Sequence, residues 1–196
     1  MNPIGVFYAT REGQTRRIAE YIGSRFQQQG FAVDAANVSD RAAVSLKSYS
    51  AVILAASVHA GRHEREMVRF VERHRAELDA IPNAFISVTL SQAGVQRANA
   101  TAAEHAAFMA DVQKMLDVFI KDTGWTPKRV LPVAGALLYK EYNFIVRFIM
   151  KWIARKAGGD TDTSRDYEYT NWTAIDGFVE EFGRSLRETP KARDAA

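Results

Sequence analysis

The chain has 196 residues, 47% of them hydrophobic, and contains no cysteine. We expect one globular domain over residues 1–188, with a disordered tail over residues 189–196. Without cysteine the chain has no disulfides, thiolate zinc sites, iron–sulfur clusters or cysteine nucleophile. The formal net charge of +3 is mildly basic, and no motif indicates nucleic-acid binding.

Residues with strand and helix periodicity alternate along the chain. Two of the strands, at residues 51–57 and 84–88, are almost entirely apolar, which predicts a parallel sheet covered by helices on both faces. Pro132 places the last strand at an edge. We therefore predict an α/β fold with a doubly wound, five-stranded parallel sheet of order 2-1-3-4-5. The predicted strands are 3–9, 32–37, 51–57, 84–90 and 129–137, and the helices are 14–28, 40–47 (short), 64–78, 102–121 and 172–187.

Residues 138–170 form an insert that breaks this alternation. Six large apolar side chains between Phe144 and Ile153 share one helical face, and five basic residues stand against a single acid over residues 139–158. Two interpretations remain open. The helix rests on an anionic membrane surface through residues 139–157, or its apolar face packs on the domain or on a second subunit.

The N-terminus leads directly into the first predicted strand without a signal peptide. No window has the roughly 18 uncharged apolar residues that a membrane-spanning helix needs. We expect a cytoplasmic protein that is peripheral at the inner face of the cell membrane.

The turn after the first strand contains the pattern Thr-x-x-Gly-x-Thr over residues 10–15. Such a turn directs free backbone N–H groups and threonine hydroxyls at one point, where the dipole of the following helix favours an anion. The Gly-rich dinucleotide fingerprint and the P-loop are both absent. As a bare pattern the turn also fits a simple capped helix start.

Two further loops leave the same predicted edge of the sheet, at residues 57–63 and 89–94. Each begins with a hydroxyl residue and contains a glycine. Ligands of doubly wound sheets bind at the carboxyl ends of the strands, where the strand order reverses. One phosphate-binding loop and two flanking loops indicate a mononucleotide with a planar head group, which is the shape of FMN.

The chain resembles the flavodoxin-like family, and within it the bacterial menaquinone-dependent protoporphyrinogen oxidases of the long-chain flavodoxin type. The resemblance runs from about residue 3 to residue 187. The block that follows the insert favours the oxidase branch over other flavodoxins. The matching segments are Ala9–Thr15, Ala56–Gly61, Phe85–Leu90, Ala134–Leu137, Gly158–Thr163 and Tyr169–Trp172.

The resemblance implies noncovalent FMN binding by three loops. The first would hold the phosphate, the second would pack beside the isoalloxazine ring, and the third would flank the ring on its other side. Glu12 stands where ordinary flavodoxins have a hydroxyl residue, so we expect it to face solvent or to pair with Arg11 or Arg16. The implied cofactor-binding residues are Thr10, Arg11, Glu12, Gly13, Gln14 and Thr15, then Ser57, Val58, His59, Ala60 and Gly61, and finally Thr89, Leu90 and Ser91.

The resemblance also implies a reaction: oxidation of protoporphyrinogen IX to protoporphyrin IX in heme biosynthesis, with menaquinone or ubiquinone as acceptor. No catalytic residue is identified; His59 and His63 are candidates for proton transfer. Arg62, Arg97 and Arg147 are candidate contacts for substrate carboxylates. No metal site is expected, and an oligomer is compatible with the sequence. The alternatives are an electron-transfer flavodoxin or quinone reductase without porphyrinogen activity, and a binding module with an empty pocket.

Overall fold

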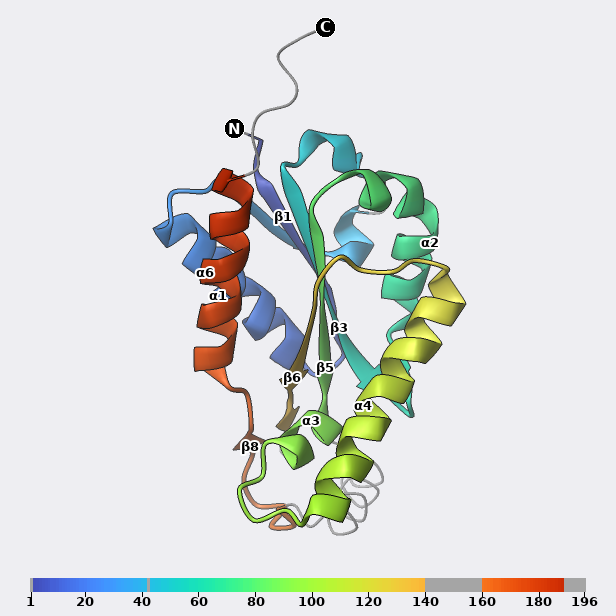
Figure 1. Ribbon diagram of the computed structural model, residues 1–196, viewed down its shortest axis with the longest axis vertical. Helices are drawn as coiled ribbons and strands as arrows, with labels where there is room; N and C mark the ends of the chain where they lie inside the picture. The colour runs from blue at the N-terminus through green and yellow to red at the C-terminus, as the bar shows by residue number, and fades with distance from the viewer. Residues whose placement is uncertain (1, 42, 140–159, 189–196) are drawn as a thin grey trace, which may run out of the picture.

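The computed structural model describes residues 2–41, 43–139 and 160–188. A central sheet is covered by α1 and α6 on one face and by α2 and α4 on the other (Figure 1). This three-layer arrangement is the predicted one. The predicted insert helix and the predicted disordered tail lie outside the described residues.

The elements follow the predicted alternation of strands and helices. In chain order they are β1 (Ile4–Ala9), α1 (Gln14–Gln28), β2 (Val33–Asn37), the 3-10 turns η1 (Val38–Arg41) and η2 (Leu46–Ser48), β3 (Ala51–His59), β4 (Arg62–His63), α2 (Arg65–Ala80), β5 (Asn83–Thr89), α3 (Leu90–Val95), α4 (Ala102–Thr123), β6 (Val130–Ala134), β7 (Ala136–Leu137), β8 (Tyr167–Glu168) and α6 (Trp172–Glu188).

The parallel sheet has the order β2-β1-β3-β5-β6, which confirms the prediction once β4 is set apart as a short hairpin partner of β3. β6 carries Pro132 and lies at the edge, where the missing N–H of proline is tolerated. Successive residues of the central strands face opposite layers and are nearly all buried. Covered faces on both sides explain why these strands are continuously apolar.

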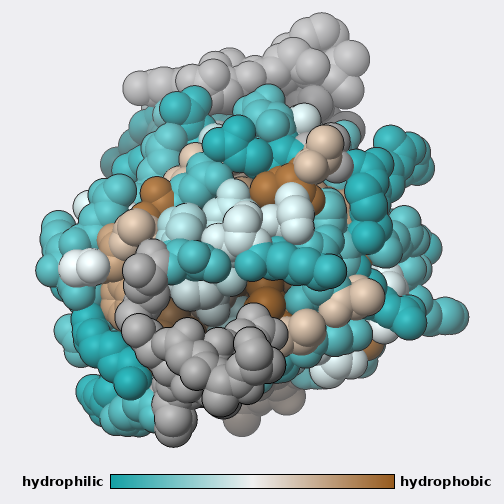
Figure 2. Space-filling view, turned by 90° about the horizontal axis from the view of Figure 1, so that it is seen from above, coloured by the Kyte–Doolittle hydropathy of each residue, from teal (hydrophilic) through white to brown (hydrophobic). Residues whose placement is uncertain are grey.

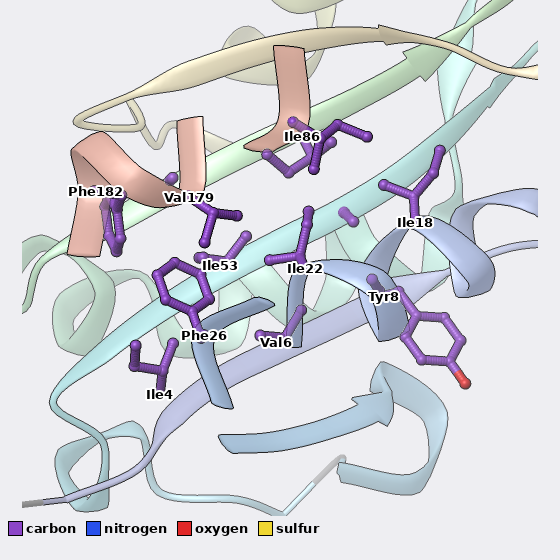
Figure 3. Packing of buried hydrophobic residues seen from close by; sticks show 14 of the residues in the cluster. Ile4, Val6, Tyr8, Ile18, Ile22, Phe26, Ile53, Ile86, Val179 and Phe182 are labelled. Carbon is purple, nitrogen blue, oxygen red and sulfur yellow. The ribbon is translucent and has the colours of Figure 1, made fainter. Parts of the chain in front are cut away.

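Two hydrophobic cores result from this alternation. Figure 3 shows the first, in which Ile4, Val6 and Ile53 of the sheet meet side chains from α1 and α6. The second lies between the other face of the sheet and helices α2 and α4, around Phe7 and Phe85. Helices α1, α2 and α6 each bury one apolar face in these cores.

Three local predictions were wrong. The helix expected at 40–47 is replaced by η1 and η2, and η2 begins against α2, where Glu77 accepts the Leu46 N–H at 2.8 Å. The strand expected over 129–137 ends at Ala134, and β7 turns away to pair with β8. The loop expected after β5 contains the short helix α3, which Thr89 caps through its side chain.

Figure 2 looks onto the end of the molecule opposite α3 and β8. That face is mostly hydrophilic, with only small and separate hydrophobic areas. The loops with the chemical signals identified in the sequence lie at the other end of the sheet.

The two described ends of the insert lie side by side. The Tyr139 hydroxyl donates to the Asp160 carbonyl oxygen at 2.8 Å, and the Tyr169 hydroxyl donates to the Asp160 carboxylate at 2.7 Å. Burial and this hydrogen bond raise the pKa of Tyr169. Tyr139 also packs edge-on against Tyr167 of β8. The described residues on either side of 140–159 are therefore held together.

The first core predicts a large effect of truncation at Phe26, which is fully buried and packs against Phe31 and Phe182. We expect Phe26→Ala to lower the free energy of unfolding by about 3–5 kcal/mol, because the cavity adds to the lost transfer free energy. Met109→Ala is the control, since Met109 is 49% exposed and its loss should change stability by less than about 0.5 kcal/mol. Urea unfolding of both variants checks this.

Candidate flavin site

Three loops meet at the carboxyl edge of the sheet. Ala9 at the end of β1 pairs with Ala56 of β3, and Ser57 of β3 pairs with Val88 of β5. The strand arrows of β3 and β5 point toward the end where α3 and β8 lie (Figure 1). The register therefore brings together the segments predicted to bind a mononucleotide.

The β1–α1 loop has the geometry of an anion-binding turn. Thr10 Oγ1 accepts the Gly13 N–H at 3.0 Å, and Gly13 has φ 90°, a conformation that glycine adopts without strain. Gly13 caps α1 without a side chain, so within the described residues the cap position supplies no side-chain hydrogen bond to the first N–H groups of the helix. Thr15 is 1% exposed, and its hydroxyl is buried with no hydrogen-bond partner among the described residues. Free amides and an unpaired hydroxyl at one helix start fit a phosphate.

Gln14 does not direct its side chain at this position. Its amide donates to Glu168 Oε1 of β8 at 3.0 Å and to the Thr170 hydroxyl at 2.9 Å. Thr170 in turn donates to the Ala134 carbonyl oxygen at 2.9 Å. Gln14 thus ties the start of α1 to β8 and Thr170, at the end of the predicted insert, and can offer the ligand only its backbone. No local pattern in the sequence indicates this connection.

The second loop is a tight hairpin between β3 and β4. Ala60 and Gly61 form its two-residue turn with φ 49° and 77°. Left-handed angles at both positions match the twist of a β-hairpin. The turn fixes the segment predicted to lie beside the isoalloxazine ring, from Ser57 to Gly61.

A buried carboxylate links the first two loops. Glu64 precedes α2, is 4% exposed and accepts the Arg11 Nε–H at 3.0 and 3.1 Å. The Ser57 hydroxyl donates to Glu64 Oε1 at 3.3 Å. The sequence analysis missed Glu64. The signal that could have identified it is an acidic residue directly before an apolar helix. A carboxylate at such a position can be buried only if cations or hydrogen-bond donors pair with it.

Glu12 pairs differently from the prediction. Its Oε2 atom lies 3.1 Å from His59 Nε2, whereas Arg11 is held by Glu64 and Arg16 by Glu20. Neither expected partner is available to Glu12, because the buried Glu64 binds Arg11, and Glu20, four residues along α1, binds Arg16.

The third loop begins at Thr89. Its hydroxyl accepts the Ser91 N–H at 3.2 Å and so starts α3. Leu90 packs against the cluster of Leu137 and Tyr139 beside the insert. Residues 89–91 therefore lie at the same carboxyl edge of the sheet as the first two loops, where they form the start of α3.

His63 is a core residue and does not face the loops. It is 5% exposed, packs edge-on against Phe85 and Phe119, and places Nε2 2.9 Å from the Ser87 hydroxyl. Burial lowers the pKa of His63 to about 4, so the ring is neutral at pH 7. Of the two histidine candidates, His59 alone is part of the loop cluster.

The candidate substrate arginines are dispersed. Arg62 pairs with Asp122 of α4 at 2.9 Å and is largely exposed. Arg97 pairs with Glu104 at 2.9 Å and lies over the ring of Phe108. Arg147 lies outside the described residues. In the described part of the chain, no group of three histidine or acidic side chains could hold a metal ion.

The geometry fits a mononucleotide with its phosphate at the start of α1, and the sequence comparisons identify the class. Residues 5–164 match the family described as Flavodoxin domain. The chain belongs to the flavodoxin family, and its cofactor is FMN. The sequence-based expectations for fold, family and cofactor are confirmed.

Within this family the chain is similar to named enzymes. It is 31% identical over 176 residues to the protoporphyrinogen IX dehydrogenase [quinone] of Escherichia coli K12, covering 90% of this chain and 92% of that protein. The protein of the same name in Leishmania major is 29% identical, with 90% of this chain and 73% of that protein covered. The chain is therefore a flavin oxidoreductase of the family.

Solved structures agree on the fold. Oxidised flavodoxin 2 from Bacillus cereus superimposes with a TM-score of 0.50 at 14% identity, covering 93% of this chain and 99% of that one. A short-chain flavodoxin associated with a bacterial microcompartment gives the same score and identity. No described helix combines the length and hydrophobicity that crossing a bilayer requires.

The buried imidazole of His63 predicts a pH dependence of stability. Its pKa falls from 6.5 to about 4 on folding, so the unfolded chain binds the proton more tightly and stability is lost as the pH drops from 6.5 through 4. The loss attributable to this residue is about 3 kcal/mol. In His63→Gln the difference in unfolding free energy between pH 7 and pH 4 should shrink by about this amount. His105→Gln, at an exposed position on α4, should keep the wild-type difference.

Proposed function

We propose that the protein oxidises protoporphyrinogen IX to protoporphyrin IX with FMN and passes the electrons to a membrane quinone, in heme biosynthesis. The observation that carries the proposal is the buried Thr15 hydroxyl, which has no hydrogen-bond partner among the described residues and lies at the start of α1, where the Gly13 cap makes no side-chain hydrogen bond. The chain is similar over nine-tenths of its length to protoporphyrinogen IX dehydrogenases. The similarity supports the substrate and the acceptor, and the loop geometry supports the cofactor.

The residues have separate roles in this proposal. Thr10 shapes the β1–α1 loop by accepting the Gly13 N–H, and Thr15 donates its hydroxyl to the phosphate. The 57–61 hairpin and the 89–91 segment hold the ring between them. When bound, FMN supplies the two-electron redox chemistry, and the protein orients and tunes it.

His59 is the proposed proton-transfer side chain. It belongs to the loop cluster and is 28% exposed, whereas His63 is enclosed in the core. Each two-electron oxidation of a porphyrinogen removes the equivalent of one hydride and one proton, and an imidazole near the site can accept the proton.

The proposal includes a peripheral place at the inner face of the cell membrane, where the quinone is available. Its support is the sequence of residues 139–157, in which Lys140, Arg147, Lys151 and Arg155 alternate with aromatic and aliphatic residues. Basic side chains of this kind are attracted to anionic lipids.

The phosphate site is tested by Thr-to-Val substitutions, which remove the hydroxyl and keep the shape of the side chain. The Thr15 hydroxyl has no partner within the described residues, so Thr15→Val should leave the stability of the FMN-free protein nearly unchanged. Its dissociation constant for FMN should rise about 10- to 100-fold with the loss of a hydrogen bond to a charged group. Adding Thr10→Val should weaken binding further.

Flavin fluorescence quenching measures these constants. Thr173→Val, at an exposed position in the first turn of α6, is the matched control and should bind FMN like the wild type. An unchanged dissociation constant in the double variant contradicts the assignment of the β1–α1 loop.

The reaction itself is tested with FMN-loaded protein, protoporphyrinogen IX and a quinone analogue, following porphyrin fluorescence. We expect porphyrin to appear at a rate that depends on both the loaded protein and the quinone. An electron carrier would instead accept electrons from a reductase partner and leave porphyrinogen at its rate of autoxidation. That second result would exclude the proposed substrate while leaving the flavin site intact.

A further inference from the structure

Four charged or titratable side chains join the first two loops. Arg11 and Glu12 come from the β1–α1 loop, His59 ends β3, and Glu64 precedes α2. Arg11 contacts Glu64 at 3.0 Å, and His59 Nε2 lies 3.2 Å from Glu64 and 3.1 Å from Glu12. His59 therefore sits between two carboxylates that belong to different loops.

The contact geometry of His59 makes its charge decisive. Its Nε2 atom is buried, and neither contact has the alignment of a hydrogen bond. A neutral ring gains little from carboxylates placed this way. A protonated ring attracts both, because Coulomb attraction at about 3 Å does not require alignment and is strengthened away from bulk water.

The local charge balance changes with the same proton. With a neutral ring, the two carboxylates outweigh the one guanidinium, and the cluster is negative. Protonation of His59 balances it. A phosphate monoester is itself an anion of about −1.5 to −2 charges at pH 7, so a negative cluster in the loop that receives it opposes binding.

We propose that His59 is a positioning residue whose protonation draws the β1–α1 loop to the hairpin and tightens the hold on FMN. Both consequences of protonation have the same sign: the two loops are attracted to each other, and a repulsive charge is removed. The inference rests on the proposed function, because it takes the FMN phosphate to lie in the β1–α1 loop.

Among the described residues, the other charges that face His59 stay constant near neutral pH. Arg62 pairs with His59 across the hairpin, but its guanidinium binds Asp122 of α4. Arg11 is occupied by Glu64. Arginine and ordinary carboxylate groups do not change charge between pH 6 and 8, whereas imidazole does. A change of FMN affinity in this pH range that is lost in His59→Gln is therefore assigned to this side chain.

The test compares FMN dissociation constants at pH 8 and pH 6 for the wild type and three variants. Protonation of the FMN phosphate affects all of them alike and cancels in each ratio to the wild type. We expect the affinity of the wild type relative to His59→Gln to rise about fivefold as the pH falls, in line with a partly exposed charge contact. Relative to His59→Gln, the FMN affinity of Glu12→Gln should rise less with falling pH than that of the wild type. The affinity of His105→Gln should rise as much as that of the wild type. A wild-type to His59→Gln ratio that stays constant with pH overturns the proposal.

A second measurement needs no flavin. A double-mutant cycle of His59→Gln and Glu12→Gln, by urea unfolding of the FMN-free protein, should give a larger coupling at pH 6 than at pH 8. Equal couplings would overturn the proton-dependent contact. If the wild type takes up no FMN while the coupling depends on pH, the proposed function fails and the contact stands, so the two failures are distinguishable.

Discussion

The parallel register of β1, β3 and β5 is the constraint on which the rest of the molecule depends. Because Ala9 pairs with Ala56 and Ser57 with Val88, the loops after these strands emerge side by side. The strands can be held in this register only because both faces are covered, by α1 and α6 on one side and by α2 and α4 on the other. The hydrophobic core thus determines where the polar chemistry is placed.

The loops at this edge are joined to one another as well as to the sheet. The Arg11–Glu64 contact connects the first loop to the start of α2, and Gln14 connects α1 to β8 and to Thr170, between β8 and α6. A buried carboxylate is tolerated only where cations and hydroxyls compensate it. Glu64 meets this condition with residues from two segments, the β1–α1 loop and the end of β3, which makes the loop arrangement dependent on charge as well as on packing.

Periodicity predicted most of the fold. The apolar runs at 51–57 and 84–88 indicated strands covered on both faces, and Pro132 indicated an edge strand, because each reflects an environment that the tertiary structure provides. The candidate site could be proposed from the sequence where its signal is local, as in the Thr-x-x-Gly-x-Thr turn. It was not predictable where the partners are far apart: Gln14 meets Glu168, and Arg11 meets Glu64. His63 shows the opposite error. Its place beside a glycine turn suggested a site residue, but its side chain packs in the core.

The adjacency of Tyr139 and Asp160 has a consequence for how such a chain can diversify. A segment whose first and last residues already touch adds only a slowly growing loop entropy as it lengthens. Its length and composition can then change while the parent domain keeps its stability. The Tyr139–Asp160 contact is therefore a position at which evolution or protein engineering can replace the intervening segment without changing the sheet.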